Sequence, residues 1–302
     1  WNKTGNWFCG LIPNTGLNAN IPKVASNNYP VLNVLAANSC KDLNIAEGAS
    51  VTISGSGSLD IAGNINKTGT LNAVDGTVRL VGTTGAQTIP ANTFATNYIK
   101  NLTINNASGA TLSGTLNLTG ILNPVAGTFT TGNQLTLKSN ASTTAVIAPV
   151  TGSVSGEMTI ERYIPARRAF RFVSSPVDAI GTIRTNWQEN GNDAPGWGTD
   201  ITGAGAETNG FDASGSNNPS LFTYSHNNAI SGTWPAVTST NIPLLAGVPY
   251  RLMVRGDRTV NQHLNASPAS VTTLRAHGTI KTGNVPVANL NGTINGITLV
   301  GN

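Results

Sequence analysis

Short runs that alternate apolar and polar residues fill residues 41–156, and this pattern limits the fold more than any other feature of the sequence. Within each run Leu, Ile or Val alternates with Thr, Ser, Asn or Asp, as in Leu43 to Ile45 and Leu102 to Ile104. A period of two is typical of β-strands that bury one face. Gly and Asn between the runs supply the corners of a coil. The pattern therefore predicts a parallel β-helix, with a β-sandwich as the alternative.

The same region contains an internal repeat. The stretch from Lys41 resembles the stretch from Lys100, because Leu43 matches Leu102 at an offset of 59 residues and Leu80 matches Leu137 at an offset of 57. We define two copies, about 41–82 and 100–140, within a β-helix-like repeat region of residues 41–156. Equivalent apolar positions of stacked repeats share one core. The positions expected to be buried are Leu43, Leu59, Leu102 and Leu116.

The charge and composition of the chain argue against several functions. Charged residues are 10% of 302, and the formal net charge of +4 is too small to bind nucleic acid over a broad surface. No run of 18 apolar residues occurs, so we expect no membrane span. Enzymes that cut acidic polysaccharides need clustered carboxylates, and the second copy of the repeat has no acid. With no nucleophile elbow and no phosphate-binding glycine motif, the protein is predicted not to be an enzyme.

The two cysteines lie near the start of the chain, in a Pro-, Asn- and Gly-rich segment that we interpret as an N-terminal cap of residues 1–40. A disulfide between Cys9 and Cys40 would suit an oxidising compartment and would stabilise the fold by about 3 kcal/mol. The alternative is two unpaired buried thiols. Two Cys and three scattered His build no metal site, so no cofactor is expected from them.

From residue 157 onward the runs become longer and carry aromatic residues, which predicts an antiparallel β-sandwich domain over residues 157–302, truncated at its C-terminal end. The basic stretch ERYIPARRAFRFVSSPV begins this domain. Phe170 and Phe172 fall at positions that can face a core, while Arg162, Arg168 and Arg171 can point outward. The alternative interpretation of this stretch is a site for an anionic sugar or a phosphate.

A long acidic loop, residues 186–212, is the candidate ligand site. Exposed Trp beside carboxylates is typical of sugar-binding surfaces, because the ring covers the apolar face of a pyranose while polar groups bind its hydroxyls. The candidate residues are Trp187, Trp197, Asp193, Asp200 and Asp212. Their oxygen atoms could also hold Ca²⁺, although no DxDxDG motif is present. The alternative is a structural loop that two buried Trp residues hold in place.

Several phrases of the sequence resemble a known group of proteins. GNWFCGLIPN, CKDLNIAEGASVTI, GEMTIERYIPARRAFRFVSSPV, NGFDAS and GVPYRLMVRGDRT are similar to segments of large secreted surface proteins of the Bacteroidetes. The resemblance implies export by the type IX secretion system, transient contact with that machinery, and an extracellular or cell-surface location. It also implies a C-terminal sorting domain, which this sequence does not contain, and it supplies no catalytic residues.

Two functions follow from these features. The first is a structural or adhesive module of an exported cell-surface protein, which binds surface glycans or other surface proteins. The second is a carbohydrate-binding accessory region of a secreted glycan-degrading enzyme whose catalytic domain lies elsewhere.

Overall fold

The computed structural model describes the chain except for residues 37, 227–231, 265, 284–289 and 302 and the side chain of Cys9. The fold is almost entirely β-structure, and it divides into two compact units. The coil unit comprises residues 1–138 and 143–158, and the antiparallel unit comprises residues 139–142 and 159–302. The chain therefore passes from one unit to the other close to residue 157, where the character of the sequence changes.

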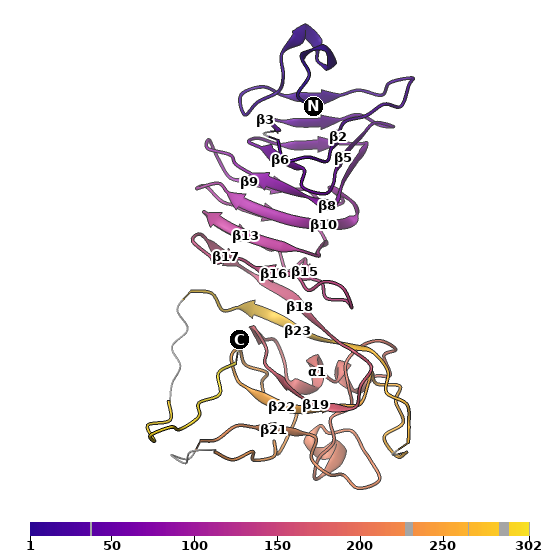
Figure 1. Cartoon of the computed structure of the whole chain (residues 1–302), viewed down its shortest axis with the longest axis vertical. Coiled ribbons are helices and arrows are strands. Elements are labelled where there is room, and N and C mark those ends of the chain that lie inside the picture. Colours follow the sequence, from indigo (N-terminus) through magenta and orange to yellow (C-terminus); the bar gives the residue numbers. More distant parts are fainter. Residues whose placement is uncertain (37, 227–231, 265, 284–289, 302) are drawn as a thin grey trace. The chain divides into compact units, whose positions relative to one another are not determined.

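The coil unit consists of short strands joined by turns (Figure 1). Its elements are η1 (Thr4–Asn6), η2 (Phe8–Gly10), β1 (Ala19–Ile21), β2 (Val31–Leu32), β3 (Ser39–Cys40), β4 (Leu43–Ile45), β5 (Ser50–Ile53), β6 (Ser58–Ile61), β7 (Ile65–Lys67), β8 (Thr70–Leu80), β9 (Gln87–Ile89), β10 (Phe94–Asn105), β11 (Ala110–Leu112), β12 (Leu116–Leu118), β13 (Ile121–Ala126), β14 (Thr128–Thr130), β15 (Leu135–Leu137), β16 (Val146–Ile147) and β17 (Ser153–Ser155).

Strands of successive turns pair in parallel, which confirms the predicted parallel β-helix. One sheet has the order β1-β4-β7, another has the order β17-β14-β11-β9, and a larger sheet includes β2-β5-β8-β10-β12-β15. Leu43 pairs with Ile65 and Leu59 with Val78, residues 22 and 19 positions further along the chain. One turn of the coil thus takes about 20 residues.

The strands β8 and β10 are long because each turns a corner of the coil. The first part of β8 pairs with β5 and its last part pairs with β6. Between the two parts lies Gly76, where a Cβ atom would come within 2.5 Å of the carbonyl oxygen of Ile53. Only glycine fits this corner without displacing the neighbouring turn.

The apolar positions of the alternating runs form the core of the coil, as predicted. Leu43, Leu59, Leu102 and Leu116 are all buried. The two copies of the repeat, however, do not occupy equivalent places. Leu43 lies in the sheet β1-β4-β7, whereas Leu102 pairs with Val78 in the larger sheet. The sequence alignment matched strands of similar composition from different sheets, because the structural repeat is the single turn.

The segment 19–40 is part of the coil. β1 pairs with β4, β2 with β5 and β3 with β6, so this segment supplies the first strands of the stack. Residues 1–18, which contain only η1 and η2, are the part of the predicted cap that lies outside the coil strands. Cys40 ends β3 with a free, buried thiol, and burial raises its pKa to about 12. The structure thus shows Cys40 unpaired, as in the alternative of two free thiols, and does not contain the predicted Cys9–Cys40 disulfide; the side chain of Cys9 lies outside the described residues.

The antiparallel unit carries the second half of the chain. Its elements are β18 (Glu157–Ile164), whose first two residues belong to the coil unit, β19 (Ala169–Val173), β20 (Val177–Ala179), α1 (Ile183–Asn186), η3 (Glu189–Gly191), η4 (Ala206–Asn209), β21 (Leu221–Thr223), β22 (Tyr250–Val254) and β23 (Thr272–Ile280). One sheet contains the order β18-β23-β20, and the other has the order β19-β22-β21. Antiparallel pairing of β20 with β23 and of β22 with both β19 and β21 agrees with the all-β prediction.

The stacked leucines of the coil should dominate its stability. Leu102 is 0% exposed and lies between Val78 and Leu122 of the adjacent turns. Leu102→Ala should therefore lower the free energy of unfolding by about 2–5 kcal/mol, measured by urea denaturation. Leu35→Ala, at a site in the same unit that is 85% exposed, is the matched control and should change stability by less than about 0.5 kcal/mol. Equal effects of the two substitutions would contradict the stacked core.

Candidate binding surface

The loop 186–212 is attached to the core at its first tryptophan. α1 begins at a capping box in which Thr182 and Thr185 bond reciprocally, and this short helix directs Trp187 inward. Trp187 is 3% exposed, and its ring meets that of Tyr250 edge to face, with 5.5 Å between the centroids. The ring of Trp187 is therefore used in packing and presents no face to a ligand.

Two of the predicted site carboxylates converge on one buried guanidinium. Asp212 accepts two hydrogen bonds from Arg258, at 2.9 Å to Nη1 and 2.8 Å to Nη2. Asp200 lies 2.9 Å from Nη1 of the same arginine. Asp212 also accepts from Nε2 of Gln188 at 2.7 Å and from the backbone N–H of Ile201 at 2.8 Å. These contacts tie both ends of the loop to the segment after β22, and they explain Asp200 and Asp212 as internal structure.

Asp200 is the most strongly perturbed acid of this cluster. Burial and the negative charge of Asp212 raise its pKa to about 7, although the charge of Arg258 and a hydrogen bond from Gln262 act in the opposite direction. The exposed carboxylate of Asp193 adds a smaller repulsion. Because Asp212 holds both Nη groups of Arg258, the arginine compensates only part of the cost of ionising Asp200.

Trp197 lies closer to the surface than Trp187. It is half-buried, and the guanidinium carbon of Arg275 lies 4.2 Å from the centroid of its ring. Gly196 and Gly198 on either side exchange backbone hydrogen bonds with Thr273, which attach this part of the loop to β23. Trp197 and Asp193 are thus the surface-facing members of the predicted site, and a ligand-binding role for the loop stays a prediction. Among the described residues, no group of three or more His, Cys, Asp and Glu side chains could hold a metal ion.

The sequence interpretation missed a second surface, on the outward side of the sheet β19-β22-β21. The register places Phe172 of β19 and Phe222 of β21 on either side of Arg251 of β22. A segment that bridges to β21 adds Trp234, since Phe222 bridges to Ala236 and Ser225 to Thr233. We call this surface the aromatic-arginine face; it consists of Phe170, Phe172, Phe222, Tyr224, Trp234 and Arg251.

The rings of the aromatic-arginine face surround the guanidinium of Arg251. Its central carbon lies 4.6 Å from the ring centroid of Phe222, 4.8 Å from that of Phe170 and 5.0 Å from that of Trp234. Phe172 stacks on Trp234 with 5.5 Å between centroids and 27° between planes. These contacts hold the guanidinium by cation–π attraction and leave a broad ring surface open, because Phe172 is 70% exposed and Phe170 is 45% exposed.

The exposed rings of Phe170 and Phe172 contradict the prediction for the basic stretch ERYIPARRAFRFVSSPV, which placed both residues in a core. Phe170 and Phe172 point outward, and Arg171 between them is half-buried on the inner side. The inner side of the sheet is filled by the buried side chains of Leu221, Tyr250, Leu252 and Val254. A period of two fixes which residues share a face, but it does not say which face is covered. The sequence does contain a sign of this aromatic face: two pairs of aromatic residues are spaced by two positions, Phe170 with Phe172 and Phe222 with Tyr224.

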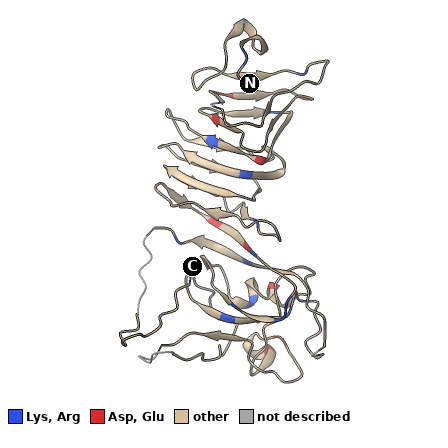
Figure 2. Ribbon diagram, viewed as in Figure 1, with Lys and Arg blue, Asp and Glu red and all other residues tan. Residues whose placement is uncertain are grey.

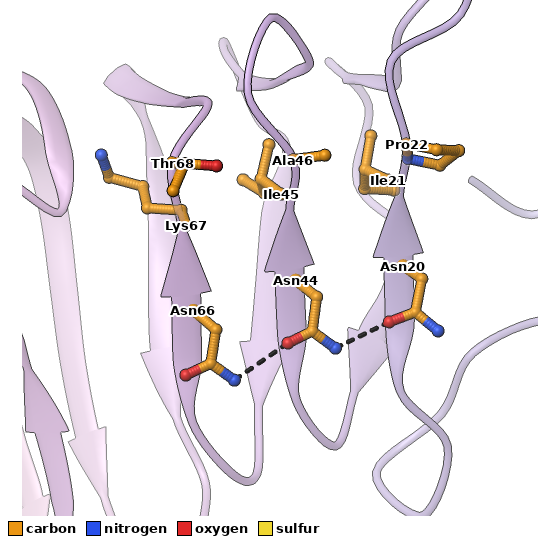
Figure 3. A pocket seen from close by; sticks show the side chains of 9 residues that line it. All are labelled: Asn20, Ile21, Pro22, Asn44, Ile45, Ala46, Asn66, Lys67 and Thr68. Carbon is orange, nitrogen blue, oxygen red and sulfur yellow. Dashed lines mark hydrogen bonds between the residues drawn. The ribbon is translucent and has the colours of Figure 1, made fainter.

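The coil unit carries a shallower surface on the sheet β1-β4-β7. A groove of about 440 Å³ follows a ladder of three asparagines, with Pro22, Ala46 and Lys67 beside it (Figure 3). Nδ2 of Asn44 donates to Oδ1 of Asn20 at 2.7 Å, and Nδ2 of Asn66 donates to Oδ1 of Asn44 at 2.9 Å. Because these amides bond to one another, the ladder links successive turns and is less open to a ligand than the aromatic-arginine face.

Charged residues occur in both units. Figure 2 shows few charged residues along the coil, and arginine within β19 and β22 of the antiparallel unit. No helix in the part of the chain that the structure describes is both long and apolar enough to cross a membrane. Comparison with models of protein families, with curated proteins and with solved structures finds no match to this chain. Function is therefore inferred from the geometry of the surfaces themselves.

The buried ion cluster should be essential to the antiparallel unit. Arg258→Met leaves Asp200 and Asp212 buried without their cation, so the free energy of unfolding should fall by about 3–5 kcal/mol in urea denaturation. Arg79→Met is the matched control, because it removes a partly exposed pair with Asp60 and should cost at most about 1 kcal/mol. A loss as small for Arg258 as for Arg79 would show that the cluster is not structural.

The raised pKa of Asp200 predicts a pH dependence. The folded chain holds a proton on Asp200 up to a pKa of about 7, whereas the ordinary value is 3.8. This contribution to stability is complete below the ordinary pKa and is lost as the pH rises to about 7. Urea midpoints of the wild type should therefore fall between about pH 4 and pH 7 relative to those of Asp200→Asn, which cannot ionise. Parallel pH profiles of the two proteins would refute the assignment.

Proposed function

We propose that this protein is a non-catalytic adhesive module that binds glycans through the aromatic-arginine face. The observation that carries the proposal is the stack of the exposed Phe172 on the half-buried Trp234, beside the guanidinium of Arg251. Ring faces cover the apolar face of a pyranose, and a guanidinium supplies several hydrogen-bond donors in a fixed plane. A contiguous apolar patch of this kind on a protein surface is typical of a binding site.

The coil unit is well suited to a structural role. Its outward positions are mainly uncharged polar residues that repeat from turn to turn. One such row is Thr88, Thr111, Thr130 and Ser155. Another is the ladder of Asn20, Asn44 and Asn66. A stack of turns with a polar outer surface gives a stiff body whose length depends on the number of turns. We propose that the coil serves as a spacer and that the antiparallel unit makes the specific contact.

We place this module on an exported protein at the cell surface. The resemblance to secreted surface proteins of the Bacteroidetes supports this location and supports export through the type IX secretion system. The low content of charged residues, 10% of the chain, and the abundance of uncharged polar side chains are compatible with an adhesive protein that works outside the cell.

Loss of the exposed ring should weaken glycan binding without unfolding the protein. Phe172→Ala removes the platform but empties no core site, so the melting temperature should change by less than about 2 °C while the dissociation constant rises about 5- to 30-fold. Affinity electrophoresis in gels that contain soluble plant, microbial and animal polysaccharides provides the measurement.

Phe8→Ala is the matched control for this experiment. Phe8 is 96% exposed in the coil unit and has no ring partner among the described aromatic pairs. Its removal should leave the migration of the protein unchanged in every gel. If no polysaccharide retards the wild type, or if Phe8→Ala weakens retention as much as Phe172→Ala does, glycan binding by the aromatic-arginine face is excluded.

A further inference from the structure

Arg251 is a cation without a counter-charge among the residues that the structure describes. No acidic side chain forms an ion pair with it in the described part of the chain, and its Nε is buried with no hydrogen-bond partner there. Arg171 and Arg255 also have buried nitrogen atoms without a hydrogen-bond partner among the described residues, but no ring contact is found for them there. Two other arginines are paired with acids: Arg275 covers Trp197 and pairs with Glu189, and Arg258 pairs with Asp200 and Asp212. Buried polar atoms normally have a hydrogen-bond partner. The half-buried guanidinium of Arg251, which has neither an acid partner nor a partner for Nε among the described residues, therefore requires an explanation.

The rings fix the guanidinium in place before any ligand arrives. Phe170, Phe222 and Trp234 lie within 5.0 Å of its central carbon, and a half-buried position limits competition from water. An arginine held in this way loses little conformational freedom when its donors bind an acceptor, which favours tight binding. The planar fork matches two oxygen atoms of one carboxylate.

Two further arginines, Arg168 and Arg255, come directly before β19 and directly after β22. They follow the Ala169–Val254 pair, which is the last pair of the two strands at this end. Burial and the positive charge of Arg168 lower the pKa of Arg255, whereas the negative charge of Asp200 raises it. Asp200 itself forms an ion pair with Arg258. Arg255 is four residues from Arg251 along the strand, which corresponds to about 13 Å. The anionic character of the ligand is therefore inferred from Arg251, whose guanidinium the aromatic rings hold in place.

We infer that the ligand of the aromatic-arginine face is an acidic polysaccharide, whose uronate carboxylate binds Arg251 while the neighbouring sugar rings stack on Phe172 and Trp234. This inference rests on the proposed function and adds the chemical class of the glycan. A neutral glycan would leave the guanidinium of Arg251 without an anion, and an acidic peptide would make poor use of the flat ring surface. Single-stranded nucleic acid also combines anions with flat rings, so it is included in the test.

The test uses the complete 302-residue chain and two forms of one polymer. Polygalacturonate and its methyl ester share a sugar backbone, and only the first has free carboxylates. The wild type should bind polygalacturonate at least about 10-fold more tightly than the ester, and added NaCl should reduce this preference. Arg251→Met keeps an apolar stem under the rings, and it should abolish the preference while it retains the weak binding of the ester.

Two further variants separate a specific role of Arg251 from a general effect of charge or folding. Arg251→Lys keeps the charge but loses the planar fork, so its preference should be intermediate. It also keeps the test decisive if Arg251→Met does not fold. Arg275→Met removes an arginine that also lies over a ring but already has an acid partner, and it should keep the full preference of the wild type.

The possible outcomes distinguish the inference from the function on which it rests. Equal binding of both polymers by the wild type, or an unchanged preference in both Arg251 variants, overturns the inference but leaves glycan binding in place. Tighter binding of dextran sulfate, of polyglutamate or of an oligothymidylate than of polygalacturonate also overturns it. A wild type that binds no polysaccharide overturns the proposed function and the inference together.

Discussion

Parallel stacking of the inward-facing apolar residues is the interaction on which the coil depends. Each turn of about 20 residues leaves half of its strand residues facing the axis, and a single turn cannot bury them. Leu59, Val78, Leu102 and Leu122 form one such column, in which every side chain covers its neighbour in the next turn. The same register places the outward residues in rows, so the core that stabilises the coil also orders its polar surface.

The antiparallel unit is stabilised in part by a buried ion cluster, because much of its chain lies in loops. Arg258 collects Asp200 and Asp212 from the loop 186–212 and also donates from Nε to the backbone carbonyl of Asn192 at 2.7 Å. One guanidinium thereby fixes three points of a segment that has little regular structure. The cost of this arrangement appears in the raised pKa of Asp200, since burial of two acids around one cation disfavours full ionisation.

The central arginine of the aromatic-arginine face is held by aromatic rings and not by carboxylates. Arg258 is buried and paired, whereas Arg251 is held by three rings and lacks an acid partner among the described residues. The inner side of the same sheet is completed by Leu221, Tyr250, Leu252 and Val254, so the outward rings are not needed for the core. Phe172 and Phe170 are exposed apolar surface that the fold does not use, and their position around an unpaired cation is the basis of the proposed glycan contact.

The strand periodicity follows from the sequence alone, and it predicted the all-β class and the burial of Leu43, Leu59, Leu102 and Leu116. It favoured a parallel coil over a β-sandwich, and the parallel strand pairs of the structure confirm the coil. It also located the change of character near residue 157. It did not determine the length of the coil repeat, because short strands of one composition align equally well in different sheets. Nor did it decide which side of β19 faces solvent, since alternation groups Phe170 with Phe172 without saying what covers them. That choice, and the meeting of Asp200 and Asp212 at Arg258, depends on strands and loops distant in sequence, and only the tertiary structure brings them together.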